Sequence, residues 1–270
     1  MAAPMLPPPP QAMTGSSADF LAGMDGVFMK QQIEMLEALT GCETKNRYHV
    51  TAVPQGTPDP PPKQWLQQFK QNAQNTPLMH AKEQSECFQR ICCPFFRAVT
   101  LPFVDATGRT FITVERPFNC DCCYMPPLYT CTQQELVVKD ASGNVIASAK
   151  ERGYCCTSCC TRTIDAFDPM GNVLYTVEAS ECGSSRGCNV FAPSCLNESY
   201  DVDVKDSAGN LVAVSSWVFP GCNCGGLTEV TNALIRFPAN APPTHRAALL
   251  GAMMLVEYTV IEFRSQKNNN

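Results

Sequence analysis

The sequence predicts a mainly β protein: a closed antiparallel barrel around a buried hydrophobic C-terminal helix, with an amphipathic helix near the N-terminus. Two observations support this prediction. Four tetrapeptides of the form Asp-x-x-Gly recur between β-rich segments and begin at Asp105, Asp140, Asp168 and Asp206. A continuous apolar segment, residues 247–256, lies close to the C-terminus.

Each Asp-x-x-Gly tetrapeptide is expected to form the turn of a β-hairpin. Asp suits the first position of a type I turn, and Gly suits the left-handed position of the G1 bulge that follows. Residues 173–178 alternate with the period of two that is typical of a strand. Four hairpins need at least eight strands, and a closed barrel leaves no strand with an exposed edge. We therefore expect a positive φ at Gly143, Gly171 and Gly209.

The two ends of the chain are not expected to fold. Residues 1–18 are mostly Pro, Ala, Ser and Gly, a composition that cannot bury enough apolar surface to form a core. Within them, Pro4–Pro10 has the PxxP pattern of an SH3 or WW ligand, although short patterns of this kind also occur in linkers. Residues 265–270 form a second disordered tail, so the ordered domain should cover residues 19–264.

An amphipathic helix is predicted over Asp19–Leu39, where Phe28, Met29 and Ile33 recur at helical spacing. Its polar face is not basic, which favours packing on the main domain over insertion into a membrane. Residues 54–86 are rich in Pro and Gln and are expected to form a variable inserted loop or a short peripheral helix.

The apolar segment is predicted to be a helix buried inside the barrel. Ten residues rise about 15 Å as a helix, roughly half the thickness of the hydrocarbon core of a bilayer. A longer span would carry Glu257 toward the bilayer centre, where a charge is costly. A helix that is apolar on all sides belongs inside a fold. Residues 245–263 should thus form a core element that runs on into the β-rich residues 258–263, with Leu250 and Leu255 covered by strands.

Composition and motifs argue against nucleic acid binding and covalent catalysis. The net charge is −5, the pI is about 5.3, and the sequence contains no cluster of Lys and Arg. Walker A, GxGxxG, HExxH and GxSxG motifs are absent. The histidines, His49, His80 and His245, are scattered along the sequence, which leaves a Cys–His nucleophile pair as an alternative without a motif to support it.

The 17 cysteines are expected to be buried, metal-bound, lipidated or free. The N-terminus has neither the basic nor the apolar region of a secretory signal, which indicates a reducing compartment. A disulfide framework is not expected there, and the odd number of cysteines also argues against complete pairing.

Three segments resemble the phospholipid scramblase family. Residues 30–48 (KQQIEMLEALTGCETKNRY) resemble its opening motif, residues 115–120 (ERPFNC) the segment that leads into its cysteine cluster, and residues 235–238 (IRFP) its closing segment. The resemblance runs from residue 28 to 263, apart from the insertion. It implies a tubby-like fold, a barrel of about twelve strands around a buried C-terminal helix, which agrees with the repeat and the apolar tail.

The resemblance also implies lipidation sites. Cys120, Cys122, Cys123 and Cys131 fall where the family carries its palmitoylated cluster. Two or more acyl chains are needed for stable attachment to a membrane. The longer run of the family is interrupted here by residues 124–130, so unmodified structural cysteines and metal ligands remain alternatives.

Residues 155–160 form a second cysteine group that could bind zinc. Cys155, Cys156, Cys159 and Cys160 contain a CxxC between two further thiols, and zinc prefers four thiolates in tetrahedral geometry. Buried or acylated thiols are the alternative.

The resemblance implies a calcium segment before the final helix, where this chain has Glu229, Thr231 and Asn240. Calcium prefers several charged oxygens, and only one of the three residues is a carboxylate. This composition argues against direct calcium binding.

The function implied by the resemblance is that of an ATP-independent phospholipid scramblase, or an accessory to scrambling, with no covalent catalysis. Acyl chains would hold the protein on the cytoplasmic face of the plasma membrane, and phospholipids would be its partners. The sequence itself shows no polar transmembrane groove. The alternative is a tubby-like, membrane-tethered, lipid-binding adaptor that recruits partners through its proline-rich N-terminus.

Overall fold

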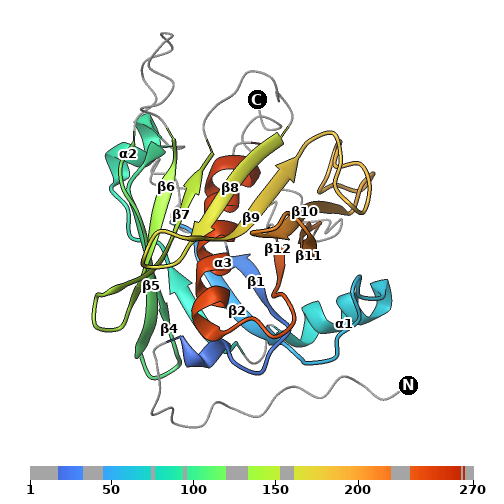
Figure 1. Ribbon diagram of the computed structural model, residues 1–270, viewed down its shortest axis with the longest axis horizontal. Coiled ribbons are helices and arrows are strands. Elements are labelled where there is room, and N and C mark those ends of the chain that lie inside the picture. Colours follow the sequence, from blue (N-terminus) through green and yellow to red (C-terminus); the bar gives the residue numbers. More distant parts are fainter. Residues whose placement is uncertain are drawn as a thin grey trace.

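Twelve antiparallel strands close into a barrel around one long helix (Figure 1). The computed structural model describes residues 18–32, 45–73, 77–93, 96–119, 133–152, 161–219, 232–262 and 264. Strands that are consecutive in the sequence are neighbours in the barrel, and β1 closes the ring by pairing with both β2 and β12. The predicted fold class, a mainly β closed barrel with a buried C-terminal helix, is confirmed.

The barrel strands are five to eight residues long, apart from the four-residue β3. They are β1 (Gly26–Gln32), β2 (Arg47–Val53), β3 (Met79–Lys82), β4 (Val99–Val104), β5 (Thr110–Arg116), β6 (Glu135–Asp140), β7 (Val145–Glu151), β8 (Thr161–Phe167), β9 (Val173–Ser180), β10 (Ser199–Asp206), β11 (Leu211–Val218) and β12 (Asn232–Arg236).

The Asp-x-x-Gly repeat forms four hairpin turns, as predicted. They join β4 to β5, β6 to β7, β8 to β9 and β10 to β11, and each of these pairs has a register shift next to its turn. Gly143, Gly171 and Gly209 have φ of 87°, 85° and 87°. In each turn the Asp carboxylate accepts hydrogen bonds from the backbone N–H groups two and four residues later, as Asp140 does from Ser142 and Asn144. The turn chemistry thus fixes both the bend and the bulge.

The central helix α3 (Pro243–Val256) continues as a π-helix, η5 (Glu257–Ile261), and not as the β-rich extension expected from the sequence. Every residue from Ala247 to Ile261 is buried, and α3 packs against β6, β7, β8 and β9. Gly251 faces the wall so closely that a Cβ there would lie 2.6 Å from Cγ2 of Val138. The predicted burial of the apolar tail is confirmed. Within the described residues, no helix has the length and apolar character needed to cross a bilayer.

The amphipathic helix predicted over Asp19–Leu39 is wrong for the described residues. A short 3-10 helix, η1 (Asp19–Leu21), precedes β1, and residues 33–39 lie outside the described part of the chain. Met29 points into the barrel core, whereas Phe28 points outward and is covered by another helix. Because both faces of β1 are covered, consecutive apolar residues occur in it, and their spacing imitates that of a helix.

The short peripheral helix expected as one alternative for residues 54–86 is confirmed, but the segment also contributes to the barrel and is therefore more than an inserted loop. They hold a peripheral helix, α1 (Lys63–Ala73), and the barrel strand β3. Phe69 of α1 packs edge-on against Phe28, with ring centroids 5.7 Å apart. A shorter helix, α2 (Cys87–Cys92), follows β3. The proline-rich segment, residues 1–17, and residues 265–270 lie outside the described residues.

Candidate functional site at the cysteine-bearing end of the barrel

All cysteines of the chain fall, in the sequence, between strands whose adjoining ends lie at one end of the barrel. In an antiparallel barrel, successive connections alternate between the two ends. One end carries the four Asp-x-x-Gly turns and the start of α3; the other carries the connections β1–β2, β3–β4, β5–β6, β7–β8, β9–β10 and β11–β12. The 17 cysteines all fall within these six connections. We call this the cysteine-bearing end and the opposite one the hairpin end.

The described thiols at this end are accessible. Cys92, Cys182, Cys188 and Cys195 are exposed and Cys93 is partly exposed, and all five are free. Cys87 is disulfide-bonded, so the expectation of a buried, metal-bound, lipidated or free thiol is wrong for this residue.

The cysteines singled out from the sequence lie outside the described residues. These are Cys120, Cys122, Cys123 and Cys131, and Cys155, Cys156, Cys159 and Cys160. Of the calcium residues, Glu229 and Thr231 also lie outside, while Asn240 has a φ of 60° in the connection between β12 and α3, at the hairpin end. The described residues contain no group of three or more His, Cys, Asp or Glu side chains that could hold a metal ion.

A buried ion-pair cluster lies beneath the cysteine-bearing end. Arg97, just before β4, donates from Nε and Nη2 to the two carboxylate oxygens of Glu83, at 2.8 and 3.1 Å. Its Nη1 and Nη2 also donate to Glu262, at the end of the central helix, at 3.0 Å each. The Glu83 side chain has no exposed surface, and that of Arg97 is 5% exposed. Burial opposes ionisation of Glu83, but the hydrogen bonds and charge of Arg97 outweigh it and lower its pKa.

This cluster fixes the connection that carries α2. Glu83 directly follows β3 and also accepts a hydrogen bond from Ser85 Oγ at 2.6 Å. Arg90, in α2, donates to the carbonyl and the hydroxyl of Ser85. The central helix, β3 and α2 are therefore linked by one chain of charge-assisted hydrogen bonds, which holds α2 in a defined position.

The β9–β10 connection is held by a different set of contacts. Asn189 Nδ2 donates to the carbonyls of Ser180 and Asp201, both at 2.7 Å, and its Oδ1 accepts from the N–H of Asp201 at 2.8 Å. Arg264, beyond the central helix, donates to the carbonyl of Ala192 at 2.8 Å. These contacts bridge the base of the connection, so its tip is presented on a fixed support.

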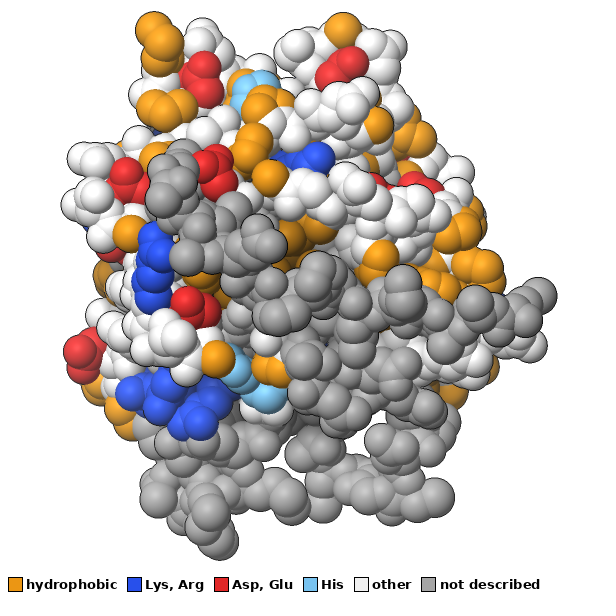
Figure 2. Space-filling view, turned by 90° about the horizontal axis from the view of Figure 1, so that it is seen from below, with side chains coloured by type: hydrophobic (Ala, Val, Ile, Leu, Met, Phe, Trp, Pro, Cys, Tyr) orange, Lys and Arg blue, Asp and Glu red, His pale blue; other side chains and the backbone are white. Residues whose placement is uncertain are grey.

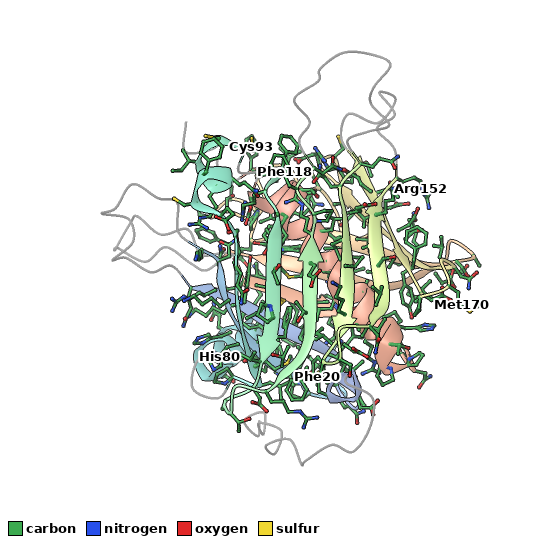
Figure 3. All side chains as sticks on the ribbon, turned by 90° about the vertical axis from the view of Figure 1, so that its left-hand side faces the viewer. Phe20, His80, Cys93, Phe118, Arg152 and Met170 are labelled. Carbon is green, nitrogen blue, oxygen red and sulfur yellow. The ribbon has the colours of Figure 1, made fainter. Side chains whose placement is uncertain are left out.

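Large apolar side chains project from the connections held in this way. Phe88 and Ile91 of α2 are 75% and 57% exposed, and Phe191 and Leu196 of the β9–β10 connection are 71% and 83% exposed. Phe118, at the end of β5, is also exposed. Each of these residues lies within five positions of a cysteine in the sequence. Figure 3 shows Cys93 and Phe118 at one end of the barrel and Phe20 at the other.

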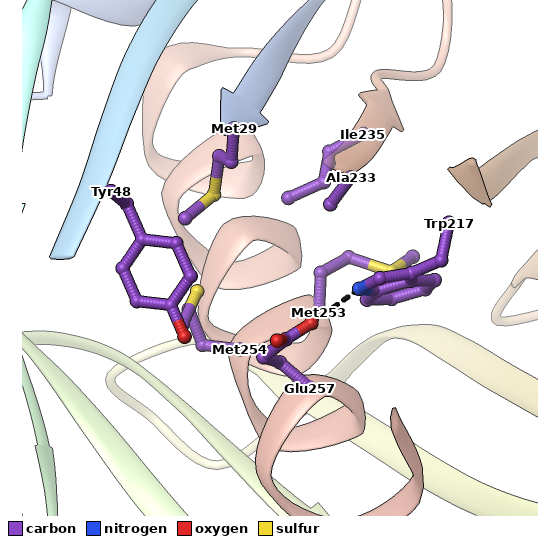
Figure 4. A pocket seen from close by; sticks show the side chains of 8 residues that line it. All are labelled: Met29, Tyr48, Trp217, Ala233, Ile235, Met253, Met254 and Glu257. Atoms are coloured by element: carbon purple, nitrogen blue, oxygen red, sulfur yellow. Dashed lines mark hydrogen bonds between the residues drawn. The ribbon is translucent and has the colours of Figure 1, made fainter. Parts of the chain in front are cut away.

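The cavity found in the described part of the barrel interior has no room for a lipid. A cavity of about 10 Å³ lies between the wall and the helix, lined by residues that include Met29, Tyr48 and Met253 (Figure 4). Such a volume holds one water molecule at most. Within this lining Trp217 Nε1 donates to the buried carboxylate of Glu257. This cavity is therefore too small for a lipid, whereas the exposed apolar side chains lie on the outer surface.

Sequence reasoning missed both the ion-pair cluster and the exposed apolar residues. Arg97, Glu83 and Glu262 are distant in the sequence, and only the closed barrel brings them together. One signal was available: Glu257 and Glu262 follow a fully apolar helix, and buried charges need partners. His49 and His80, which the sequence separates, face each other on β2 and β3 with ring centroids 4.6 Å apart.

Comparison with known proteins gives a consistent result. A family model described as Scramblase matches residues 68–263. "Phospholipid scramblase 1" of Mus musculus is 26% identical over 260 residues, which cover 96% of this chain and 68% of that protein. "Phospholipid scramblase family member 5" of Homo sapiens is 26% identical over 252 residues, or 90% of this chain and 76% of that protein. No solved structure matches.

Proposed function

The chain belongs to the scramblase family, and on that premise we propose that it moves phospholipids between bilayer leaflets without ATP, directly or as an accessory to scrambling. The observation that carries this proposal is the family match, which extends from α1 through β3 to the end of the central helix. It includes the connections that carry most of the cysteines and the exposed apolar residues.

The small size of the cavity beside the central helix favours lipid movement outside the barrel. A headgroup that crosses the hydrocarbon region loses its hydrogen bonds to water, which costs about 2–7 kcal/mol for each polar group left without a partner. A protein lowers this barrier with a polar path or by thinning the bilayer. Since the cavity beside the central helix holds at most one water, the lipid would move along the outside of the barrel, next to the cysteine-bearing end.

The membrane attachment that we propose is by acyl chains on Cys120, Cys122, Cys123 and Cys131, on the cytoplasmic face of the plasma membrane. The sequence position of these thiols supports the proposal, because they fall between β5 and β6, and the strand ends that flank them lie at the same end of the barrel as Phe88 and Phe191. Two acyl chains give stable attachment, and apolar side chains at the same surface would enter the interface beside them.

We further propose that the activity needs no tightly bound calcium. Glu229, Thr231 and Asn240 supply one carboxylate between them, which is few for a calcium site. Removing calcium with a chelator should leave the rate of lipid movement unchanged.

The test is reconstitution of the full chain in liposomes that contain a fluorescent lipid, followed by quenching from outside. A scramblase brings both leaflets to the surface, so quenching exceeds the outer half of the signal. A lipid-binding adaptor leaves the inner leaflet protected. One observation favours this alternative: binding at the outer surface of the barrel needs no polar path for lipid, and the cavity beside the central helix offers none. Quenching limited to the outer leaflet would reject the scramblase proposal.

A further inference from the structure

Two histidines face each other across neighbouring strands on the outer wall of the barrel. His49 of β2 lies directly opposite His80 of β3 in the strand register. The adjacent residues Tyr48 and Ala81 belong to the barrel core, so both imidazoles point outward. Their ring centroids lie 4.6 Å apart, and the ring planes are inclined at 85°. The sheet thus holds two metal-ligating side chains side by side, although they are distant in the sequence.

The spacing of this histidine pair fits one metal ion. Residues directly opposite each other on antiparallel strands have Cβ atoms about 4.5–5.5 Å apart. Zinc binds imidazole nitrogen at about 2.0–2.1 Å, so two nitrogens bound at a tetrahedral angle lie roughly 3.4 Å apart. His49 and His80 are both partly exposed, so each ring can turn about its side-chain bonds without displacing the core. Both rings can therefore reach one ion without a movement of the backbone.

Gln32, at the end of β1, holds one nitrogen of His49. Its Nε2 lies 3.2 Å from Nδ1 of the imidazole. A glutamine amide carries both an oxygen and an NH2 group, so with the amide turned over the oxygen accepts the Nδ1–H of His49. Nε2 of His49 then keeps its lone pair, as in histidine ligands whose other nitrogen is held by an outer partner. Burial and the charges of His80 and Lys30 lower the pKa of His49, which keeps its imidazole uncharged at neutral pH.

The charges around the pair decide which class of metal fits. Lys30 lies opposite His49 on β1, and Arg47 and Lys82 form the neighbouring outward pair on β2 and β3. Figure 2 shows His side chains on the surface beside a group of Lys and Arg side chains. These cations disfavour Mg²⁺ and Ca²⁺, which depend on carboxylate oxygens. Imidazole is a good ligand for zinc, nickel and copper, so the pair selects a late transition metal.

The histidine pair is separate from the thiols of the chain. Figure 3 shows His80 toward the part of the barrel that carries Phe20, away from Cys93 and Phe118. The free thiols of the described residues belong to the cysteine-bearing end. A metal ion on the two imidazoles would therefore occupy a site of its own, which cysteine modification does not alter.

We propose that His49 and His80 together bind a divalent late transition metal ion of the zinc class, and that the ion cross-links β2 to β3. Two protein ligands leave the other positions of the ion to water, so it binds reversibly, unlike the ion of a closed four-ligand structural site. This inference does not depend on the proposed function.

The cross-link would act where the barrel has its shortest strand. β3 spans four residues, and its ladder with β4 consists of His80 opposite Val104 and Ala81 opposite Phe103. A short ladder leaves a strand dependent on its other neighbour, which here is β2. An ion that binds only the folded arrangement of both strands stabilises that arrangement and suppresses local opening of β3.

The experiment titrates the full chain with zinc chloride and measures how fast diethyl pyrocarbonate modifies each histidine, by mass spectrometry of its peptides. A bound ion occupies the lone pair that the reagent attacks, and the readout is residue-specific, so zinc on the thiols does not enter it. His49 and His80 should be protected together, at one zinc concentration. H49Q should raise the concentration that protects His80 by about tenfold or more, and H80Q should do the same for His49, because even an outer partner of a ligand contributes about that much.

His245, the third histidine of the chain, is the matched control, since it is partly exposed at the start of α3. It should stay reactive in zinc, and H245Q should keep the protection of the pair. Magnesium chloride should protect none of the three. Zinc should also slow hydrogen exchange at the amides of β3 in the wild type and not in H49Q.

The wild-type pattern tests the site without any variant. The proposal is overturned if zinc leaves His49 and His80 reactive, or if it protects His245 at the same concentration. It is equally overturned if each histidine of the pair stays protected when the other is replaced, or if magnesium protects the pair as zinc does.

Discussion

At Arg97, a single guanidinium satisfies two carboxylates that arrive from β3 and from the end of the central helix. A buried pair of this kind adds little to stability compared with apolar packing, but removing one partner leaves an uncompensated charge. The ring of Tyr258 lies 5.3 Å from the guanidinium carbon, which closes the site further from water. Arg97 therefore matters to the fold mainly because its loss would leave the carboxylate of Glu83 buried without a cation.

R97M should lower the free energy of unfolding by about 3–5 kcal/mol, because it leaves Glu83 buried without its cation. Urea denaturation measures the change. K139M, which removes a partly exposed pair with Glu115, is the control and should cost less than about 1 kcal/mol. If R97M loses as little free energy of unfolding as this control, the buried ion-pair cluster does not hold the fold together.

As the pH falls and Glu83 becomes protonated, the stability of the wild type and that of R97M should change in opposite directions. The lowered pKa of Glu83 means that its contribution is present above the ordinary glutamate pKa, about 4.3, and is lost as the pH falls through the lower folded value. In R97M, burial without the cation raises the pKa of Glu83, so protonation relieves the variant. The stability gap between wild type and R97M should therefore narrow in acid.

Among the elements, the hairpin turns follow most directly from sequence. At Gly143 an added Cβ would meet no atom within 4 Å, so space does not require glycine there. The requirement is the backbone itself, with φ of 87°, where a Cβ clashes with its own peptide. G143V should cost about 1–2 kcal/mol in thermal or urea unfolding, and G143N less, because Asn tolerates this conformation. Equal costs for the two variants would contradict this account.

The success of the turns and the failure at β1 have one explanation. An Asp-x-x-Gly turn makes its hydrogen bonds within five residues, so its conformation can be predicted from the local sequence. The structure of Gly26–Gln32 depends on β2, β12 and α1, which cover both its edges and its outer face. The apolar spacing of this segment is compatible with a helix, but pairing with strands distant in the sequence makes it a strand.

The same reasoning applies to the surfaces of the molecule. The lipidation sites, Cys120, Cys122, Cys123 and Cys131, lie close together in the sequence, so the resemblance can predict them, and they stay a prediction. His49 and His80 contact each other from β2 and β3, and the exposed side chains of Phe88 and Phe191 come from two different connections. Strand order and register had to be known before either could be recognised.

At the scale of the whole molecule, the two ends of the barrel differ in chemistry although both expose apolar side chains. The hairpin end exposes Met170 and Leu211 beside tight turns with Asp side chains. The cysteine-bearing end exposes Phe191 and Leu196 on a longer connection among free thiols. If this second end faces the bilayer, attachment has two separable parts, acyl chains and apolar side chains, and each can be removed alone.

For the unacylated protein, F191D/L196D should weaken binding to phosphatidylcholine vesicles by about tenfold or more, because each side chain loses about 1–2 kcal/mol of apolar burial in the interface. M170D/L211D adds the same charge at the hairpin end and should bind like the wild type. Equal losses in the two double variants would reject the orientation, because a protein that lies with its cysteine-bearing end on the bilayer must be insensitive to charges at the opposite end.

In cells, replacing Cys120, Cys122 and Cys123 by Ala should move the protein to the soluble fraction, since a few apolar side chains do not replace two acyl chains. A triple variant that stays on membranes after a high-salt wash would reject the acyl anchor.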